Sequence, residues 1–199
     1  MNEPYFIETI KVVDGKFLNL PYHMERMNAT MIAFFNTTIF VELWIGDIPE
    51  ELRTGVVKCR IIYSYRNVKV EYERYQIRKI SSLKLVSADN LDYSFKYADR
   101  SSLNTLLEQK GDCDDILIVK DGYITDTSYS NVVFENASGL YTPSTYLLAG
   151  TKRKYLLDKG IINQAEIKVE DIQKYNKLHI INAMIDLQDN VKLDISGLL

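Results

Sequence analysis

The first candidate for chemistry is a lysine that aromatic residues flank in the sequence. Lys96 stands between Phe95 and Tyr97 in the segment Tyr93–Tyr97. A lysine in apolar surroundings has a lowered pKa, and the neutral amine is the form that attacks an aldehyde. Taken alone, Lys96 is also typical of an ordinary surface lysine, so its interpretation depends on the other segments.

A second candidate is a carboxylate followed by a polar cluster. Asp126 comes after a predicted hairpin, and Thr127, Ser128 and Ser130 lead from it to Asn131, where another strand is predicted. Such an aspartate either caps a turn or serves a site, and the polar residues either form a solvated loop or line that site. The pattern leaves both interpretations open.

Two further segments carry features suited to anions. Gly150 precedes a predicted helix that continues to Lys159, and the backbone N–H groups at a helix start attract negative charge. The alternative is an ordinary glycine-capped helix with the basic run Thr151–Lys154 on a solvated face. Arg26 follows Pro21 on a predicted helix, and its guanidinium can hold a phosphate with two N–H groups. The alternative for Arg26 is a pair with a nearby acid.

Mixed strands and helices must position these residues. The pairs Asp14-Gly15 and Asp121-Gly122 predict tight hairpin turns, and apolar residues at helical spacing over Met24–Phe34 predict a helix face packed on a core. Strands are predicted over residues 5–13, 16–20, 56–63, 68–75, 83–86, 115–120, 123–125, 131–135 and 140–141, and within 177–184. Helices are predicted from Pro21, from Pro49, over residues 99–109 and over residues 151–159. This order favours two α/β layers over a β-barrel or a helical bundle.

The composition narrows the class of protein. The chain has 199 residues and a formal net charge of -3, which gives no basic field for nucleic acid. Cys59 and Cys113 are not in a metal-binding spacing, and two free thiols favour a reducing compartment. The sequence shows no signal peptide and no apolar run long enough to span a membrane. We therefore expect a cytoplasmic protein with no metal site, no nucleic-acid partner and no membrane partner.

Taken in order, these segments resemble the motifs of the fold-type IV enzymes that use pyridoxal 5′-phosphate (PLP), the class IV aminotransferase family. Its members include branched-chain aminotransferases, D-amino-acid aminotransferases and 4-amino-4-deoxychorismate lyases. The resemblance runs from about Ile7 to Asp186. It implies an α/β fold of the α+β type, similar to D-amino-acid aminotransferase, and a homodimer. We expect a small N-terminal α/β domain over residues 1–86 and a larger PLP-binding domain over residues 87–199.

The resemblance also implies roles for single residues. Lys96 would bind the aldehyde of PLP and move the substrate proton, and Arg26 would contact the phosphate. Asp126 would pair with the pyridine nitrogen in place of the glutamate that is usual in the family. Asn131, with Ser130 before it, would support the site beside the cofactor.

The turn from Gly150 to Arg153 resembles the Gly-x-Thr-Arg phosphate turn of the family. Lys152 takes the place of the usual threonine, and Thr151 offers a hydroxyl instead. The backbone N–H groups of Thr151 and Lys152 would bind phosphate whatever their side chains are.

Details of the sequence favour the lyases. The run Lys96–Arg100 is similar to the lyase pattern Lys-x-x-Asn-Arg, and Ile181–Met184 is similar to the lyase pattern Cys-Asn-Ala-Leu. Thr9 and Lys11, with Arg100 and Asn182, would then lie at the substrate, a small-molecule amine. We expect conversion of 4-amino-4-deoxychorismate to 4-aminobenzoate and pyruvate, a reaction of folate biosynthesis.

The sequence also departs from the family pattern. A first strand hairpin is missing, and Arg60–Asn67 replaces the glycine-rich loop of the lyases. Both features concern the enclosure of the substrate. An aminotransferase for branched-chain or D-amino acids, and a non-catalytic relative that binds PLP, therefore remain as alternatives.

Overall fold

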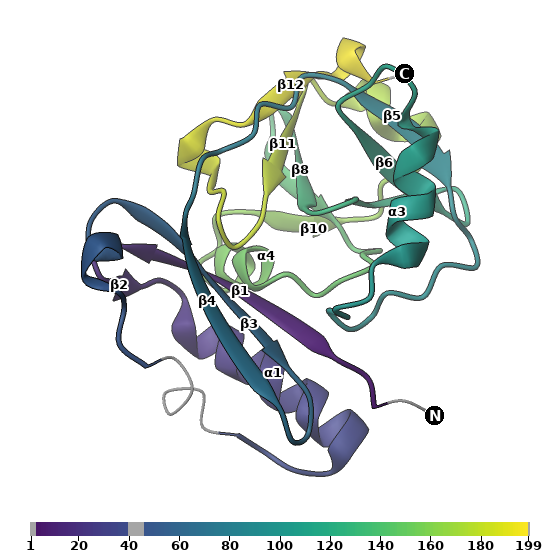
Figure 1. Ribbon diagram of the computed structural model, residues 1–199. Coiled ribbons are helices and arrows are strands. Elements are labelled where there is room, and N and C mark those ends of the chain that lie inside the picture. The colour runs from purple at the N-terminus through teal and green to yellow at the C-terminus, as the bar shows by residue number, and fades with distance from the viewer. Residues whose placement is uncertain (1–2, 40–45, 199) are drawn as a thin grey trace. The chain divides into compact units, whose positions relative to one another are not determined.

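The chain folds into two compact units. The computed structural model describes residues 3–39 and 46–198 and is shown in Figure 1. Unit 1 consists of Met1–Ile77 and the short segment Phe95–Asp99, and unit 2 consists of Arg78–Ser94 and Arg100–Leu199.

This division differs from the boundary that we expected after residue 86. That boundary would cut β5 (Leu83–Ser87), which pairs in parallel with β6 (Asp115–Lys120) of unit 2. The segment Phe95–Asp99 belongs to unit 1 because its backbone pairs with the first strand, through a bridge between Phe6 and Tyr97. Pairing between distant segments sets the division, and the local pattern does not report such pairing.

Unit 1 is built on an antiparallel sheet. Its strands are β1 (Phe6–Val13), β2 (Lys16–Phe17), β3 (Val56–Tyr63) and β4 (Val68–Arg74), in the order β2-β1-β3-β4. The predicted turn Asp14-Gly15 joins β1 to β2, and both of its residues have positive φ, 47° and 77°. A two-residue turn with positive φ at both positions matches the twist of a hairpin.

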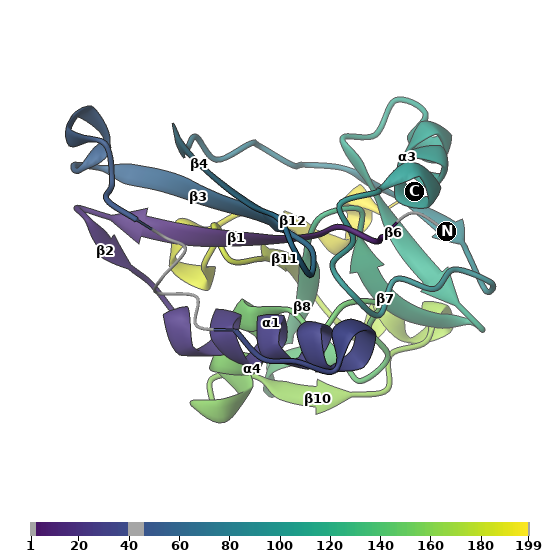
Figure 2. The same ribbon diagram turned by 60° about the horizontal axis from the view of Figure 1, so that its bottom comes forward.

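A long helix and a short one complete unit 1. Helix α1 (Leu20–Phe35) lies along one face of the sheet (Figure 2), and η1 (Glu50–Leu52) is a single 3-10 turn. Met27 and Met31 are buried in the core that α1 forms with β1 and β3, which confirms the predicted apolar stripe. Phe34, at the end of that stripe, is 37% exposed.

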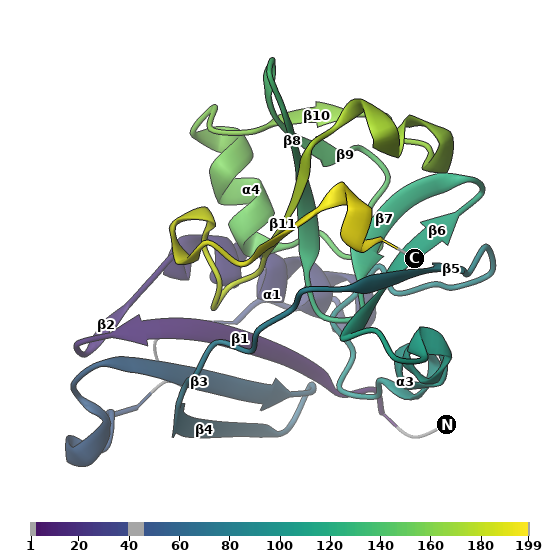
Figure 3. The same cartoon turned by 90° about the horizontal axis from the view of Figure 1, so that it is seen from above.

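Unit 2 is built on a larger sheet that curls on itself (Figure 3). Besides β5 and β6, its strands are β7 (Tyr123–Thr127), β8 (Asn131–Asn136), β9 (Gly139–Pro143), β10 (Asn163–Ala165), β11 (Lys177–Ile181) and β12 (Lys192–Asp194). The order runs β10-β9-β8-β7-β6-β5, and β11 pairs with β8 and β12. The predicted Asp121-Gly122 turn joins β6 to β7, and both of its residues have positive φ.

Short helices connect these strands. They are α3 (Ser101–Leu107), α4 (Thr151–Asp158) and the 3-10 turns η2 (Glu108–Lys110), η3 (Val169–Lys174), η4 (Leu187–Asp189) and η5 (Ile195–Gly197). The core of unit 2 includes Leu117, Ile124, Val132, Phe134 and Ile180. Within residues 3–39 and 46–198, no helix has both the length and the apolar character that a membrane crossing requires.

Candidate functional site

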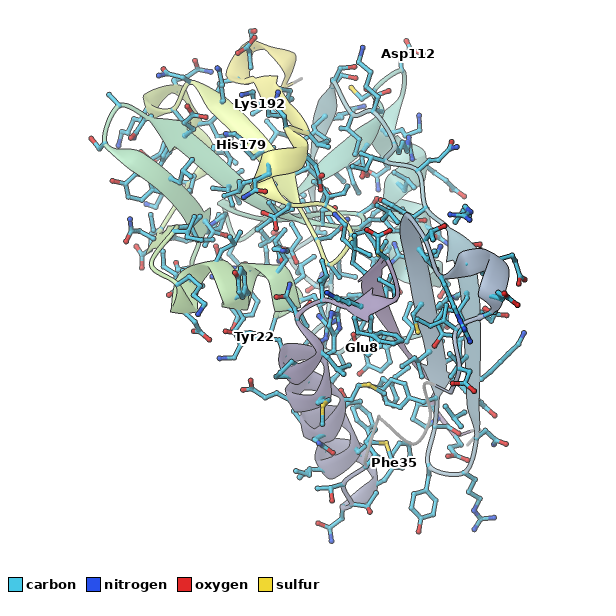
Figure 4. All side chains as sticks on the ribbon, turned by 90° about the vertical axis from the view of Figure 1, so that its left-hand side faces the viewer. Glu8, Tyr22, Phe35, Asp112, His179 and Lys192 are labelled. Atoms are coloured by element: carbon cyan, nitrogen blue, oxygen red, sulfur yellow. The ribbon has the colours of Figure 1, made fainter. Side chains whose placement is uncertain are left out.

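In unit 1, a buried carboxylate holds two side chains of α1. Glu8 lies on β1 beside α1 (Figure 4), and its side chain is fully buried. Its Oε1 accepts a hydrogen bond from Arg26 Nε at 2.7 Å, and its Oε2 accepts one from Arg26 Nη2 at 2.7 Å. His23 Nδ1 lies 2.7 Å from the same Oε2. Arg26, which we expected to bind phosphate or to pair with a nearby acid, therefore has such an acid in place.

The charges in this cluster follow from burial and pairing. Burial opposes ionisation of Glu8, but the charge of Arg26 and the hydrogen bonds from His23 and Arg26 outweigh it and lower the pKa of Glu8 to about 2. Burial also lowers the pKa of His23, against the opposite effect of its bond to Glu8. At neutral pH the cluster therefore consists of an anion, a cation and a neutral imidazole.

Lys96 belongs to the same unit. Its carbonyl accepts a hydrogen bond of 2.9 Å from the N–H of Ile7, which fixes the backbone of this segment on β1. Phe95 and Tyr97 pack against the core of unit 1, and Lys96 is half-buried between them in the sequence. Its charge contributes to the lowered pKa of His23, so the amine lies within electrostatic range of that imidazole. The partial burial agrees with the sequence pattern.

The predicted substrate residues of β1 lie on its other face. Thr9 and Lys11 alternate with Glu8 along the strand, so they project from the face opposite α1, where both are half-buried. Their partners on β3 are Arg60 and Lys58 in the antiparallel register. This face of the sheet therefore combines a hydroxyl with cations, two of which pair with carboxylates of β4.

In unit 2, Asp126 is the centre of a hydrogen-bonded cradle. Its Oδ1 accepts a 2.8 Å bond from Asn131 Nδ2, and its Oδ2 accepts bonds from the N–H groups of Leu147 and Leu148 at 3.2 and 2.9 Å. Burial is the largest influence on this carboxylate, and it raises the pKa of Asp126 to about 6 despite these bonds. Asp126 therefore ionises close to neutral pH, and a cation beside it would favour its charged form.

Asn131 also explains the glycine before α4. A Cβ on residue 150 would lie 1.8 Å from Asn131 Oδ1, a separation that no real structure tolerates. Asn131 Nδ2 donates a second bond, of 3.1 Å, to the carbonyl of Leu148. Only glycine permits this close approach between the start of α4 and the amide of Asn131.

The first turn of α4 carries buried side chains at the beginning of a helix. Thr151, Lys152 and Arg153 are all buried. The first N–H groups of a helix have no acceptor within the helix, and the helix dipole makes this end attractive to an anion. The N–H groups at the start of α4, beside the amide of Asn131, are therefore of a kind that suits an anion such as phosphate.

The side chains of this turn have protein partners. Lys152 Nζ makes a 2.5 Å ion pair with Asp186 Oδ2. Arg153 donates to Thr142 Oγ1 at 3.2 Å and to the carbonyl of Pro143 at 2.8 Å, which anchors α4 on β9. Backbone groups rather than these two side chains are therefore the donors that this turn presents.

The remaining predicted residues surround the β7–β8 turn. Asn182 Nδ2 donates to Ser130 Oγ at 2.9 Å, and its Oδ1 accepts from the N–H groups of Met184 and Ile185. Arg100 Nη2 donates to the carbonyl of Ser128 at 2.7 Å, and its guanidinium lies 4.0 Å from the ring centroid of Tyr129. Both residues thus hold the loop that carries the polar cluster of the sequence.

Sequence reasoning missed two participants in unit 1. Glu8 occupies an apolar register of β1, with Phe6 and Ile10 on the same face, and His23 is three residues before Arg26 on α1. A charged residue in a strand's apolar register signals a buried ion pair, so the pattern could have identified Glu8. No local signal marks Asp186 as the partner of Lys152, because the two are far apart in the sequence.

Known proteins are similar to this chain over most of its length. The model of the family "Amino-transferase class IV" matches residues 5–189. A Haemophilus influenzae protein without a functional name is 36% identical over 180 residues, which are 89% of this chain and 96% of that protein.

Solved structures are similar to the chain as well. One is described as a candidate 4-amino-4-deoxychorismate lyase from Haemophilus somnus; it is 32% identical, with a TM-score of 0.81 over 92% of this chain and 98% of that one. Another is described as a candidate amino-acid aminotransferase from Mesorhizobium loti; it is 20% identical, with a TM-score of 0.78 over 98% of this chain and 99% of that one. A third, a hypothetical aminotransferase from Mycobacterium tuberculosis in its PLP-bound form, is 17% identical, with a TM-score of 0.77 over 91% and 78%. The last two likenesses concern the fold alone.

The mixed α/β fold of the fold-type IV enzymes, which the motifs implied, is thereby confirmed, and the curled sheet is a finding of the structure. The matched family model covers most of the chain, and a relative above 30% identity spans nearly its whole length. The chain belongs to the class IV aminotransferases, a family of PLP-dependent enzymes.

Proposed function

We propose that this enzyme is a PLP-dependent lyase that converts 4-amino-4-deoxychorismate to 4-aminobenzoate and pyruvate. The observation that carries the proposal is the 32% identity to the Haemophilus somnus protein described as a candidate lyase of this kind, over 92% of this chain and 98% of that one. The run Lys96–Arg100 and the contact of Asn182 with Ser130 support the same choice.

Each unit by itself carries donors of a kind that suits the cofactor. In unit 1, Arg26 is a guanidinium suited to phosphate, and Lys96 is an amine suited to an aldehyde. In unit 2, the backbone at Gly150, Thr151 and Lys152 would bind phosphate, and Asn131 would hold that turn in place. When bound, PLP supplies an aldehyde that captures the substrate amine and a ring that accepts the electron pair released from the substrate carbon.

Asp126 would keep the ring nitrogen protonated. Its pKa of about 6 makes it largely ionised above neutral pH, and a pyridinium N–H beside it would favour that ionised form further. The carboxylate already accepts three hydrogen bonds, which fix its orientation before the cofactor binds. A fixed anion loses less conformational freedom on binding than a mobile one.

Lys96 would carry the proton transfers. As a neutral amine, it takes the proton from the carbon that bears the substrate nitrogen. The bond from the ring to the enolpyruvyl oxygen then breaks, the ring becomes aromatic, and the departing enolate takes up a proton at its methylene carbon to become pyruvate. We assign the substrate contacts to Thr9, Lys11, Arg100 and Asn182.

We also propose that the enzyme works as a homodimer in the cytoplasm. The dimer follows from the resemblance to the family. Two buried free cysteines, Cys59 and Cys113, support a reducing compartment. Light scattering of the purified protein measures the mass directly, and a monomer at working concentration would overturn the dimer.

The test of the lyase proposal is a product assay. Purified protein with PLP is given 4-amino-4-deoxychorismate, and pyruvate is followed through lactate dehydrogenase while 4-aminobenzoate is quantified separately. Equal amounts of the two products are expected, and Lys96→Ala is expected to produce neither.

Other outcomes identify the alternatives. Oxo acid from an amino donor, without 4-aminobenzoate, would identify an aminotransferase. A yellow protein with no turnover of any amine would identify a non-catalytic binder. A protein that binds no PLP would overturn the proposal at its first step.

A further inference from the structure

The Glu8 side chain occupies a position in the core of unit 1 that the strand pattern reserves for apolar residues. It shares its face of β1 with Phe6, Ile10 and Val12, all of which are fully buried. An ionised carboxylate at such a position costs several kcal/mol unless partners compensate it. Apolar residues would fill the position at lower cost, so a charge here calls for an explanation other than packing.

The partners of Glu8 are arranged to fix one guanidinium. Arg26 reaches Glu8 through Nε and Nη2, which form one edge of the planar group. A two-point contact of this kind fixes the plane of the guanidinium as well as its position. Covalent geometry then directs the second N–H of Nη2 and one N–H of Nη1 toward the tip of the side chain, away from the edge that Glu8 holds. The Arg26 side chain is 14% exposed, so the cluster lies at the border of the core.

His23 fixes Glu8 in turn. Since Glu8 is ionised and His23 is neutral, the proton between them belongs to Nδ1, which donates to Oε2. His23 is buried and lies three residues before Arg26 on α1, so both side chains come from one face of the helix. The groups that face His23 are Glu8, Arg26 and, by its charge, Lys96.

We propose that Glu8 and His23 are positioning residues for phosphate recognition: they hold the guanidinium of Arg26 in the orientation that binds the phosphate of the cofactor. This inference rests on the proposed function, because it takes Arg26 as a phosphate ligand. A guanidinium binds phosphate more tightly when its plane is already fixed before the phosphate arrives. A long arginine side chain without a fixed partner samples many rotamers and must be ordered on binding. Lys96 belongs to the same unit, and its charge acts on His23.

The experiment compares two ligands that differ only in the phosphate. The dissociation constants of PLP and of pyridoxal are measured by absorbance titration of the apoprotein, and the constant for pyridoxal divided by the constant for PLP reports the contribution of the phosphate. Glu8→Gln keeps the size of the side chain and removes its charge. We expect it to lower the ratio about tenfold, the loss typical of one charge-assisted hydrogen bond. Arg26→Gln is expected to lower the ratio at least as far.

The double variant tests whether Glu8 acts through Arg26. If it does, Glu8→Gln adds nothing in the Arg26→Gln background. The matched control is Glu73→Gln, which removes the charge of an exposed partner of Lys58 in the same sheet and is expected to leave the ratio unchanged.

A second pair of variants covers the case in which Glu8→Gln does not fold. His23→Asn retains a donor close to the position of Nδ1, and His23→Leu removes it. We expect His23→Leu to lower the ratio severalfold and His23→Asn to restore most of it. Thermal melting and far-ultraviolet circular dichroism check that each apoprotein is folded.

The outcomes separate this inference from the proposed function. If Arg26→Gln leaves the ratio unchanged, the phosphate role of Arg26 is wrong. If Arg26→Gln lowers the ratio but neither Glu8→Gln nor His23→Leu does, the positioning roles are overturned while the proposed function stands. An equal loss of affinity for both ligands would show that Glu8 serves only the fold.

Discussion

Asn131 Nδ2 donates a 2.8 Å hydrogen bond to Oδ1 of Asp126 at the point where β7 pairs with β8. The other amide atom, Oδ1 of Asn131, lies where a Cβ on residue 150 would fall. One short side chain therefore ties the carboxylate of β7 to the beginning of α4. In the proposed function, these are the places that hold the ring nitrogen and the phosphate, so their spacing is set by the fold before any ligand binds.

Gly150→Ala is expected to destabilise the apoprotein by about 2–4 kcal/mol, because the added methyl group collides with Asn131. Urea unfolding followed by circular dichroism measures this loss. The same substitution in an Asn131→Ala background should cost at least about 1 kcal/mol less, because the colliding atom is gone. Equal costs in both backgrounds would mean that the strain at Gly150 has another source.

Asp126 should give stability an unusual dependence on pH. Its pKa is about 6 in the fold and 3.8 in the unfolded chain, so the folded state binds the extra proton between these values. The stabilisation that this proton gives the folded state is complete below pH 3.8 and is lost as the pH rises through about 6. Since one pKa unit corresponds to about 1.4 kcal/mol, the loss is on the order of 3 kcal/mol.

The measurement is the free energy of unfolding of the wild type minus that of Asp126→Asn, taken from pH 4 to pH 7. The difference should fall across this range, because other groups cancel between the two proteins. A difference that stays level, or that rises with pH, would contradict the raised pKa of Asp126.

The ion pair of Lys152 with Asp186 should stabilise the fold more than the exposed pair of Lys154 with Asp158 on the same helix. The side chain of Lys152 is 6% exposed and that of Asp186 is 30% exposed. Asp186→Asn leaves a buried ammonium without its counter-ion, and we expect a loss of about 1–2 kcal/mol in the apoprotein, reduced from the fully buried case by solvent screening. The double variant with Lys152→Met should recover part of that loss.

The control is the exposed pair of Lys154 with Asp158, which also belongs to α4. Asp158→Asn should change the free energy of unfolding by no more than about 0.5 kcal/mol. Equal losses in the free energy of unfolding for Asp186→Asn and Asp158→Asn would mean that the burial of Lys152 does not make its ion pair stronger.

Lys96 should be the residue that binds the cofactor covalently. Borohydride reduction of the PLP-loaded protein is expected to add the mass of the reduced cofactor to the peptide that contains Lys96, as peptide mass spectrometry can verify. Lys96→Ala should take up none, whereas Lys84→Ala, which removes an exposed lysine of β5, should be labelled like the wild type. Label on a different lysine of the wild type would refute the assignment.

Local sequence signals predicted the elements well where the chemistry is local. The turns Asp14-Gly15 and Asp121-Gly122 both adopt positive φ, as their residue types require, and the strands at Val56–Tyr63 and Asp115–Lys120 have their predicted limits. The short strands β10 and β12 were not predicted. Each has three residues, too few for an alternating pattern to appear.

For the candidate site, too, some features depend on neighbouring residues and others depend on the tertiary structure. The sequence alone determined which residue types are available and in which order, because motif spacing and helix starts are properties of neighbouring residues; the class IV family could be inferred from that order. Only the tertiary structure decided the partners: Glu8 for Arg26, Asp186 for Lys152, and Asn131 for both Asp126 and the turn at Gly150. The physical reason is that the energy of a buried charge depends on the groups that folding brings to it, and residues far apart in the chain supply those groups.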